Sequence, residues 1–164
     1  MAITFNADEI FEMATRIESN GAAYYRRTAE VAKDPKTRDV LASLAVMEDD
    51  HLRRFAAMRS QLGQSKKQSS VFDPEGDAAK YLQAMADSRV FDVRVDPAKL
   101  VTGQESPQQI LKTAIGLEKD SIVFYLGMRD LVPNSAGKED IEAIIREEMA
   151  HITTLSKRLG ELHA

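Results

Sequence analysis

The sequence predicts an all-α protein, a four-helix bundle made of two helical hairpins joined by a long crossover. Five prolines at 35, 74, 97, 107 and 133 leave long segments between them in which apolar residues recur with helical spacing. In addition, one set of polar residues in the range 17–55 recurs at 117–155, displaced by one hundred positions without a gap. Each half therefore predicts two antiparallel helices joined by a short loop.

The first hairpin is expected to span about 7–62. Asn6, followed three residues later by Glu9, resembles a capping box, and the helix that it begins continues to about residue 32. Asp34 and Pro35 then supply an N-cap and a proline at the first helical position. The second helix of this hairpin should end near Gly63.

The second hairpin is expected to span about 107–160. Ser106 and Pro107 repeat the cap-and-proline start, and an apolar stripe that includes Leu126 continues until the helix stops before Pro133. A fourth helix should begin at about Lys138. We expect no lysine or arginine on the inward stripes of the helices.

Residues 63–105 form the crossover between the hairpins. Its first part, GQSKKQSS, is typical of a linker, and residues 77–88 predict a short helix. Residues 89–97 alternate like a strand, although the sequence offers that strand no obvious partner. Because a long crossover is compatible with a bundle, we expect residues 1–164 to form a single domain.

The composition excludes several classes of function. The chain has 164 residues, of which 43% are hydrophobic and 29% charged, as is usual for a globular domain. A net charge of −4 without a basic stripe argues against nucleic acid as a partner. Neither a signal peptide nor a membrane span is evident, and cysteine is absent, so a cytoplasmic location is expected and any metal must be bound by oxygen and nitrogen.

The repeated residues predict a metal site. Only four positions are identical between residues 17–55 and 117–155, and three of these four pairs carry metal-binding side chains. Positions i and i+3 share a face of a helix, so each Glu-x-x-His presents one oxygen and one nitrogen to a common point. The expected metal ligands are Glu18, Glu48, His51, Glu118, Glu148 and His151.

The charge of this set predicts two metal ions. Four ionised carboxylates in a bundle core would suffer desolvation and mutual repulsion unless cations balanced them. Two divalent ions would do so, and a set rich in oxygen with one imidazole per ion favours iron. Manganese or a mixed iron and manganese pair also fits, and zinc could substitute.

Three residues near the predicted site allow alternatives. Glu147 lies four residues before His151 and could share its face, but the repeat pairs Glu148 with Glu48 and leaves Met47 opposite Glu147. Tyr25 and Tyr125, the fourth identical pair, follow the first glutamates by two helical turns. They either fill the core or donate hydrogen bonds to the carboxylates that bind metal.

These residues resemble the ligand pattern of the ferritin-like superfamily of di-iron carboxylate proteins, and among them the rubrerythrin group. The resemblance covers the two hairpins, about two thirds of the chain. It implies that the first and third helices give one glutamate each and that the second and fourth give Glu-x-x-His. It also implies a di-iron oxidoreductase that reacts with hydrogen peroxide or oxygen in defence against oxidative stress.

Two departures from the rubrerythrin pattern affect the expected function. Rubrerythrins carry a rubredoxin domain with cysteine ligands, whereas this chain has no cysteine, so a separate electron-donor protein is expected. They also have an additional glutamate where this chain has Ser121. A ferroxidase or iron-handling protein, a di-iron hydroxylase, and a helical interaction domain that binds adventitious metal therefore remain alternatives. Pairing through helix faces would make a homodimer.

Overall fold

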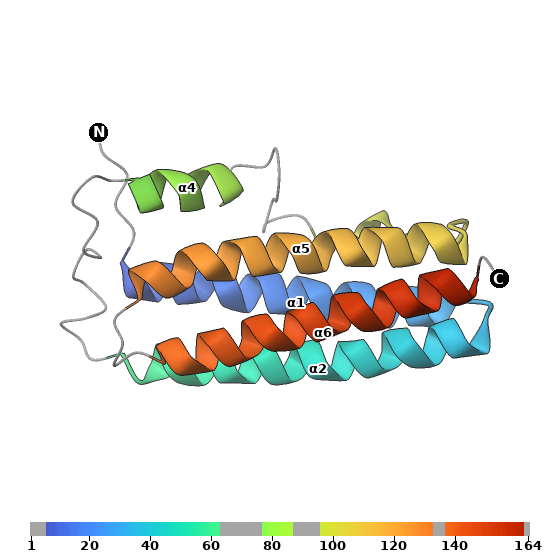
Figure 1. The fold of residues 1–164 in the computed structure, drawn as a ribbon, viewed down its shortest axis with the longest axis horizontal. Coiled ribbons are helices and arrows are strands. Elements are labelled where there is room, and N and C mark those ends of the chain that lie inside the picture. Colours follow the sequence, from blue (N-terminus) through green and yellow to red (C-terminus); the bar gives the residue numbers. More distant parts are fainter. Residues whose placement is uncertain (1–5, 63–76, 87–95, 133–136, 163–164) are drawn as a thin grey trace.

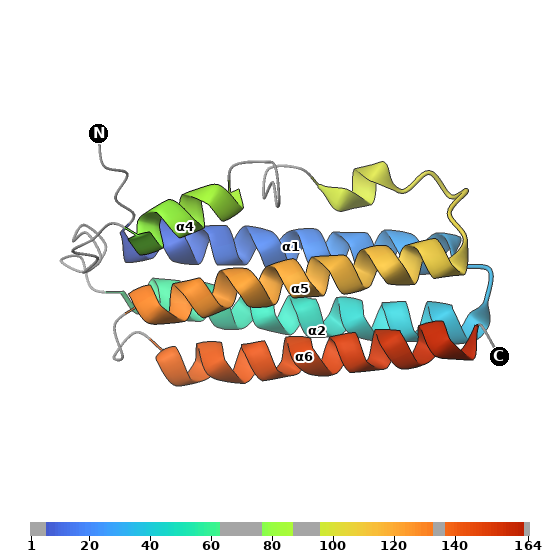
Figure 2. The same ribbon diagram turned by 45° about the horizontal axis from the view of Figure 1, so that its top comes forward.

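Four long helices lie side by side and form the body of the protein. The computed structural model describes residues 6–62, 77–86, 96–132 and 137–162, and every regular element within these ranges is a helix. Figures 1 and 2 show the long helices as one bundle, which confirms the predicted all-α fold. The elements are α1 (Ala7–Val31), α2 (Pro35–Ser60), α4 (Asp77–Ala86), the 3-10 helix η1 (Pro97–Leu100), α5 (Pro107–Leu131) and α6 (Lys138–Glu161).

Three of the long helices begin where their capping residues predict. The Asn6 side chain accepts from the backbone N–H of Glu9, whose carboxylate accepts from the backbone N–H of Asn6 in return. Ser106 and Gln109 form the same reciprocal pair at the start of α5. Asp34 accepts from the backbone of α2, which begins with proline. These bonds satisfy backbone donors that a helix leaves free at its first turn.

The core consists of two apolar clusters, one towards each end of the bundle. One cluster combines the start of α1 with the end of α2, the end of α5 and the start of α6, and Phe11, Phe55 and Phe124 belong to it. The other cluster combines the opposite halves of the same helices, including Leu41 and Leu155. The repeated glutamates and histidines lie between the two clusters along every helix, so apolar packing encloses them from both ends.

The crossover contributes two short helices that pack on the bundle. As predicted, residues 77–86 form a helix, α4, which packs against α5, while η1 packs against α1 (Figure 2). The strand-like pattern at 89–97 and the linker-like segment at 63–70 lie almost entirely outside the described residues. The sequence did not predict η1, which begins at Pro97.

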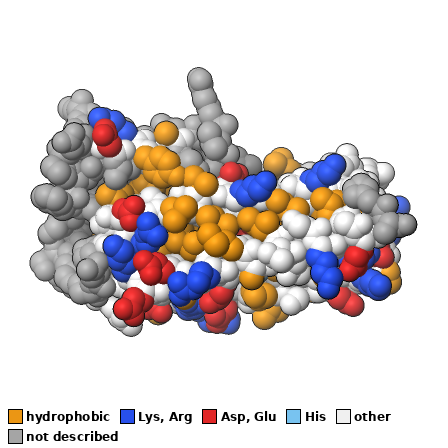
Figure 3. Space-filling view, viewed as in Figure 1, with side chains coloured by type: hydrophobic (Ala, Val, Ile, Leu, Met, Phe, Trp, Pro, Cys, Tyr) orange, Lys and Arg blue, Asp and Glu red, His pale blue; other side chains and the backbone are white. Residues whose placement is uncertain are grey.

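Two expectations about which side chains face inward were wrong. Leu126 is 36% exposed, and Val123 and Met149 are exposed as well. Figure 3 shows apolar side chains on one face of the bundle. Arg158 of α6 is buried, and its guanidinium donates to the side chains of Asp34 and Thr37. This arginine lies near the start of α2, far along the helix from the repeated glutamates, and joins α6 to the other hairpin.

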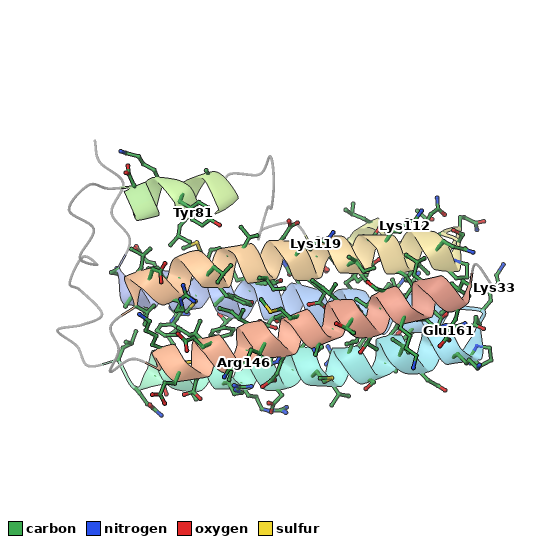
Figure 4. All side chains as sticks on the ribbon, in the orientation of Figure 1. Lys33, Tyr81, Lys112, Lys119, Arg146 and Glu161 are labelled. Atoms are coloured by element: carbon green, nitrogen blue, oxygen red, sulfur yellow. The ribbon has the colours of Figure 1, made fainter. Side chains whose placement is uncertain are left out.

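Substitution of Gly127 by alanine should separate α4 from α5. A Cβ atom at Gly127 would lie 2.6 Å from a ring carbon of Tyr81, whose hydroxyl donates to the carbonyl of Val123 at 2.9 Å. Figure 4 shows Tyr81 between α4 and α5. Alanine usually stabilises a helix interior over glycine by about 1 kcal/mol, but a collision of this kind costs about 1–3 kcal/mol. We therefore expect a net loss of stability in chemical denaturation and faster proteolysis within residues 63–105.

Gly116 provides the matched control for this substitution. It also lies inside α5, but a Cβ atom there would meet nothing within 4 Å. Gly116→Ala should therefore stabilise the protein, and Tyr81→Ala should remove the penalty from Gly127→Ala. Equal stabilisation by the two glycine substitutions would contradict the proposed collision.

Candidate metal centre

The structure brings all the sequence-predicted ligands together in the middle of the bundle. One glutamate comes from α1 and one from α5, and α2 and α6 each add a glutamate and a histidine one turn apart. None of the six residues is more than 4% exposed. They are Glu18, Glu48, His51, Glu118, Glu148 and His151.

These residues form two overlapping groups, each suited to one metal ion. Glu18 and His51 belong only to the first group, and Glu118 and His151 belong only to the second. Glu48 and Glu148 belong to both. Within each group, one oxygen or nitrogen atom from every residue lies within 4.8 Å of the others. The two shared carboxylates therefore lie where they could bridge two ions.

Both histidines direct Nδ1 towards the carboxylates. Nδ1 of His51 is 3.1 Å from a Glu148 oxygen and 3.5 Å from a Glu18 oxygen. His151 has Nδ1 2.9 Å from the other Glu148 oxygen and 3.2 Å from a Glu48 oxygen. The two imidazole rings are stacked, with centroids 5.5 Å apart and an interplanar angle of 18°. Nδ1 is therefore the ring atom that would bind metal in both cases.

Buried polar atoms without partners indicate that the protein's own side chains do not satisfy this cluster. Among the described residues, one carboxylate oxygen each of Glu18, Glu48 and Glu148, and both ring nitrogens of His151, are buried without a well-formed hydrogen bond. Such atoms cost about 1–3 kcal/mol each, and more when charged. Two divalent cations would engage these atoms and balance four carboxylates, so the donor set fits the predicted metal pair.

The pKa values of the cluster also reflect an excess of negative charge in the site. Burial raises the pKa of Glu18 to about 7, and the charge of Glu148 adds to this effect. Burial, together with the charges of Glu18 and Glu148, holds the pKa of Glu48 well above its usual range. Burial alone would lower the pKa of His51, but bonds to Glu148 and Glu18 raise it to about 11. Without metal the cluster retains protons, and metal binding would release them.

Two tyrosines bind the outer carboxylates, which are the two glutamates that belong to only one ligand group each. Each tyrosine comes from the hairpin opposite to its glutamate. Tyr25 of α1 donates its hydroxyl hydrogen to Glu118 of α5, and Tyr125 of α5 donates to Glu18 of α1. Burial, followed by the charges of nearby glutamates, raises the pKa of both phenols well above the usual value, so both remain donors. Such bonds orient a ligand carboxylate and leave its other oxygen available. The sequence placed both tyrosines near the site but gave no indication of this crosswise pairing.

Glu147 has a role that the sequence did not reveal. It belongs to neither ligand group. Instead, its carboxylate lies 2.8 Å from Nε2 of His51 in the other hairpin, and Arg54 donates to both of its oxygens at 3.0 and 3.1 Å. Spacing within α6 could not predict this contact, because it depends on how α2 and α6 face each other.

Ser121 and Gly21 occupy equivalent positions, one turn after the outer glutamates. The Ser121 hydroxyl donates to the carbonyl of Leu117 in its own helix at 3.0 Å, and no seventh carboxylate joins the described ligand groups. A Cβ atom at Gly21 would lie 2.7 Å from a carboxylate oxygen of Glu48. Because glycine has no side chain, the carboxylate of Glu48 can occupy this space.

Substitution of Gly21 by alanine should weaken metal binding. The added methyl group would displace the carboxylate of Glu48, and a misplaced ligand should lower metal affinity about 10- to 100-fold, as the loss of a supporting contact does. Anaerobic titration with Co(II), followed by absorbance, would measure this loss. Gly116→Ala is again the control and should retain the wild-type affinity, whereas wild-type affinity in Gly21→Ala would contradict the prediction.

The fold and the site define a class of protein, the four-helix bundle with a buried cluster of carboxylates and histidines. The rubrerythrin family model matches residues 9–95, more than half of the chain. The chain belongs to the rubrerythrin family. Family and cluster together support a di-iron protein.

The fold is also that of a solved structure. A Thermotoga maritima crystal structure at 2.30 Å resolution, described as that of a candidate ferritin-like diiron-carboxylate protein, matches with a TM-score of 0.76. The match has 23% identity and covers 96% of this chain and 97% of the other, which shows that the two share the ferritin-like fold. Comparison with curated proteins found no match. No helix within the described ranges is long and apolar enough to cross a membrane.

Proposed function

We propose that the six buried residues hold two iron ions and that the protein is an oxidoreductase that reduces hydrogen peroxide or oxygen. The observation that supports this proposal is the pair of overlapping ligand groups that share Glu48 and Glu148. When bound, two Fe(II) ions can supply the two electrons that reductive cleavage of an O–O bond requires. The oxygen and nitrogen donors also suit manganese, and zinc could occupy the site without redox chemistry.

The protein's own residues would orient the ligands and restrict access of water. Tyr25 and Tyr125 hold the outer carboxylates from opposite hairpins, and the apolar clusters exclude water from both ends of the site. On the surface, a hollow of about 340 Å³ is lined by Val46, Met47, Asp50, Arg53 and Glu147. Since Glu147 contacts His51, this hollow lies beside the site, and we propose that a small oxidant approaches from this side.

Reduction of one hydrogen peroxide to two water molecules consumes two electrons and two protons. Because the chain contains no cysteine, it cannot hold a cysteine-ligated iron centre as an electron store. We therefore propose that a separate protein donates the electrons. We also propose that the enzyme acts in the cytoplasm, as a homodimer, in defence against peroxide.

Rapid mixing would test the proposed reaction. Protein loaded anaerobically with two Fe(II) per chain is mixed with hydrogen peroxide or with oxygen, and oxidation is followed by absorbance. At least one oxidant should oxidise the centre faster than it oxidises free Fe(II) in the same buffer. Glu139→Gln, an exposed change on α6, should retain this reaction, and Glu148→Ala, which removes a shared ligand, should lose it. Oxidation no faster than that of free iron by either oxidant would refute the proposal.

Ferroxidase activity is a second candidate, and the environment of Ser121 favours it. The hydroxyl of Ser121 is bonded within its own helix, so the described site has six ligands and no additional carboxylate. An iron-handling protein would turn over many Fe(II) ions and store the product in a closed assembly of many subunits. A dimer on size-exclusion chromatography, with oxidation that stops after two Fe(II) per chain, would contradict this alternative.

A further inference from the structure

The two histidines of the site differ in what lies beyond them. Nε2 of His51, on the side away from the other ligands, is 2.8 Å from a carboxylate oxygen of Glu147. Glu147 is in turn held by Arg54, which donates to both of its oxygens and also to the carbonyl of Asp140 at 3.4 Å. His51 is fully buried, whereas the Glu147 side chain is 42% exposed at the edge of the surface hollow.

His151 has no corresponding support among the described residues. Its Nε2 is buried without a hydrogen-bond partner there. The repeat explains the difference, because the residues equivalent to Glu147 and Arg54 are Met47 and Thr154. Methionine is at best a weak acceptor, and the Thr154 hydroxyl already donates to the carbonyl of Ala150 at 3.0 Å.

A carboxylate on the outer ring nitrogen changes how a histidine binds metal. It accepts the hydrogen on Nε2, which fixes the tautomer with its lone pair on Nδ1 and also fixes the rotation of the ring. It also makes Nδ1 a stronger donor, and loss of such a partner typically lowers metal affinity about 10- to 100-fold. Only one of the two described ligand groups has this arrangement.

We infer that the two metal positions are inequivalent, and that Glu147, supported by Arg54, makes the position at Glu18 and His51 the tighter one. Glu147 is thus a positioning residue for one metal ion. The inference rests on the proposed function only in requiring that the six residues bind two metal ions. It does not depend on which oxidant reacts there.

Metal titration of three forms of the protein would test the inference. Wild type, Glu147→Met and Glu139→Met are each titrated anaerobically with Co(II), and absorbance and calorimetry report the two binding steps. Glu147→Met copies the residue of the other hairpin, and Glu139→Met changes an exposed glutamate of the same helix. Wild type and Glu139→Met should bind in two distinct steps. In Glu147→Met the affinity of the tighter step should fall about 10- to 100-fold and so approach the affinity of the weaker step.

A second measurement identifies the histidine concerned. In Co(II)-loaded wild type, proton NMR should show one strongly shifted, slowly exchanging imidazole N–H, because only Nε2 of His51 has a carboxylate acceptor among the described residues. Glu147→Met should lose this signal while the weaker binding step keeps its affinity, which a general destabilisation of the fold would not explain.

The outcomes separate this inference from the proposed function. Two equal steps in wild type that Glu147→Met leaves unchanged would overturn the inference alone, as would equal weakening of both steps. Absence of Co(II) and Fe(II) binding in wild type would overturn the proposed function and the inference with it.

Discussion

Exchange of Glu48 for glutamine is expected to abolish binding of the metal pair while leaving the metal-free protein almost as stable as before. Burial and the charges of Glu18 and Glu148 hold the pKa of Glu48 well above its usual range, so the metal-free fold favours the neutral form of this carboxyl. Glutamine has nearly the same shape as a protonated glutamate and is also neutral. The metal-free fold should therefore change by less than about 1 kcal/mol.

The same exchange removes a ligand from both metal positions, because Glu48 belongs to both groups. A neutral amide cannot bridge two cations as a carboxylate does, so affinity for the pair should fall about 100-fold or more. Iron content per chain and chemical denaturation in chelator would measure the two effects. Glu139→Gln, an exposed change in the first turn of α6, should keep the wild-type iron content and lower stability by less than about 1 kcal/mol. Wild-type iron content in Glu48→Gln would remove Glu48 from the site.

Removal of the metal ions is expected to reverse the dependence of stability on pH. Burial and the charge of Glu148 raise the pKa of Glu18 from 4.5 to about 7 in the metal-free fold. Between pH 4.5 and about pH 7 the folded state binds more protons than the unfolded state. The free energy of unfolding therefore falls as pH rises through this range. Since each pKa unit corresponds to about 1.4 kcal/mol, this loss amounts to roughly 3 kcal/mol from Glu18.

The histidines extend the same trend to higher pH. Burial alone would lower both histidine pKa values, but the surrounding carboxylates raise that of His51 from 6.5 to about 11 and that of His151 to about 12. Their contribution to metal-free stability is therefore complete below about pH 6.5 and declines as pH rises towards the folded values.

With metal bound, stability should instead rise with pH, because the ions displace these protons. Ions present at one thousand times the dissociation constant would stabilise the fold by about 4 kcal/mol. Chemical denaturation from pH 4.5 to 8, in chelator and in excess Mn(II), would compare the two slopes. Glu18→Gln should flatten the slope in chelator. Metal-free stability that increases with pH through this interval would contradict the prediction.

Much of the fold could be predicted because the sequence determines helix ends and helix faces locally. Asn6, Asp34 and Ser106 accept hydrogen bonds from the first turn of the helix that follows each of them, so a short stretch of sequence is enough to locate these starts. The ligands lay in phase with apolar stripes in both halves, and the repeat favoured Glu148 over Glu147. The structure brings the chosen residues into one cluster and leaves Glu147 outside it.

Contacts between hairpins could not be predicted, because they depend on how far each helix is rotated and shifted against its neighbours. Spacing along α6 makes Glu147 a neighbour of His151, yet its carboxylate contacts His51 on α2. Leu126 fits an inward stripe by spacing but lies on the surface. Arg158 is charged and yet buried, since Asp34 and Thr37 from the other hairpin bind its guanidinium.

The crosswise bonds of Tyr25 and Tyr125 have a consequence for symmetry. Each tyrosine donates to the outer glutamate of the other hairpin. A twofold rotation that places each hairpin on the other would therefore place each of these bonds on the other. An isologous interface has this property, because residue i contacts j and j contacts i. Two identical half-length chains related by a twofold axis could make the same pair of bonds. The four pairs that are identical between residues 17–55 and 117–155 are the ligands and tyrosines that such a symmetric dimer would need.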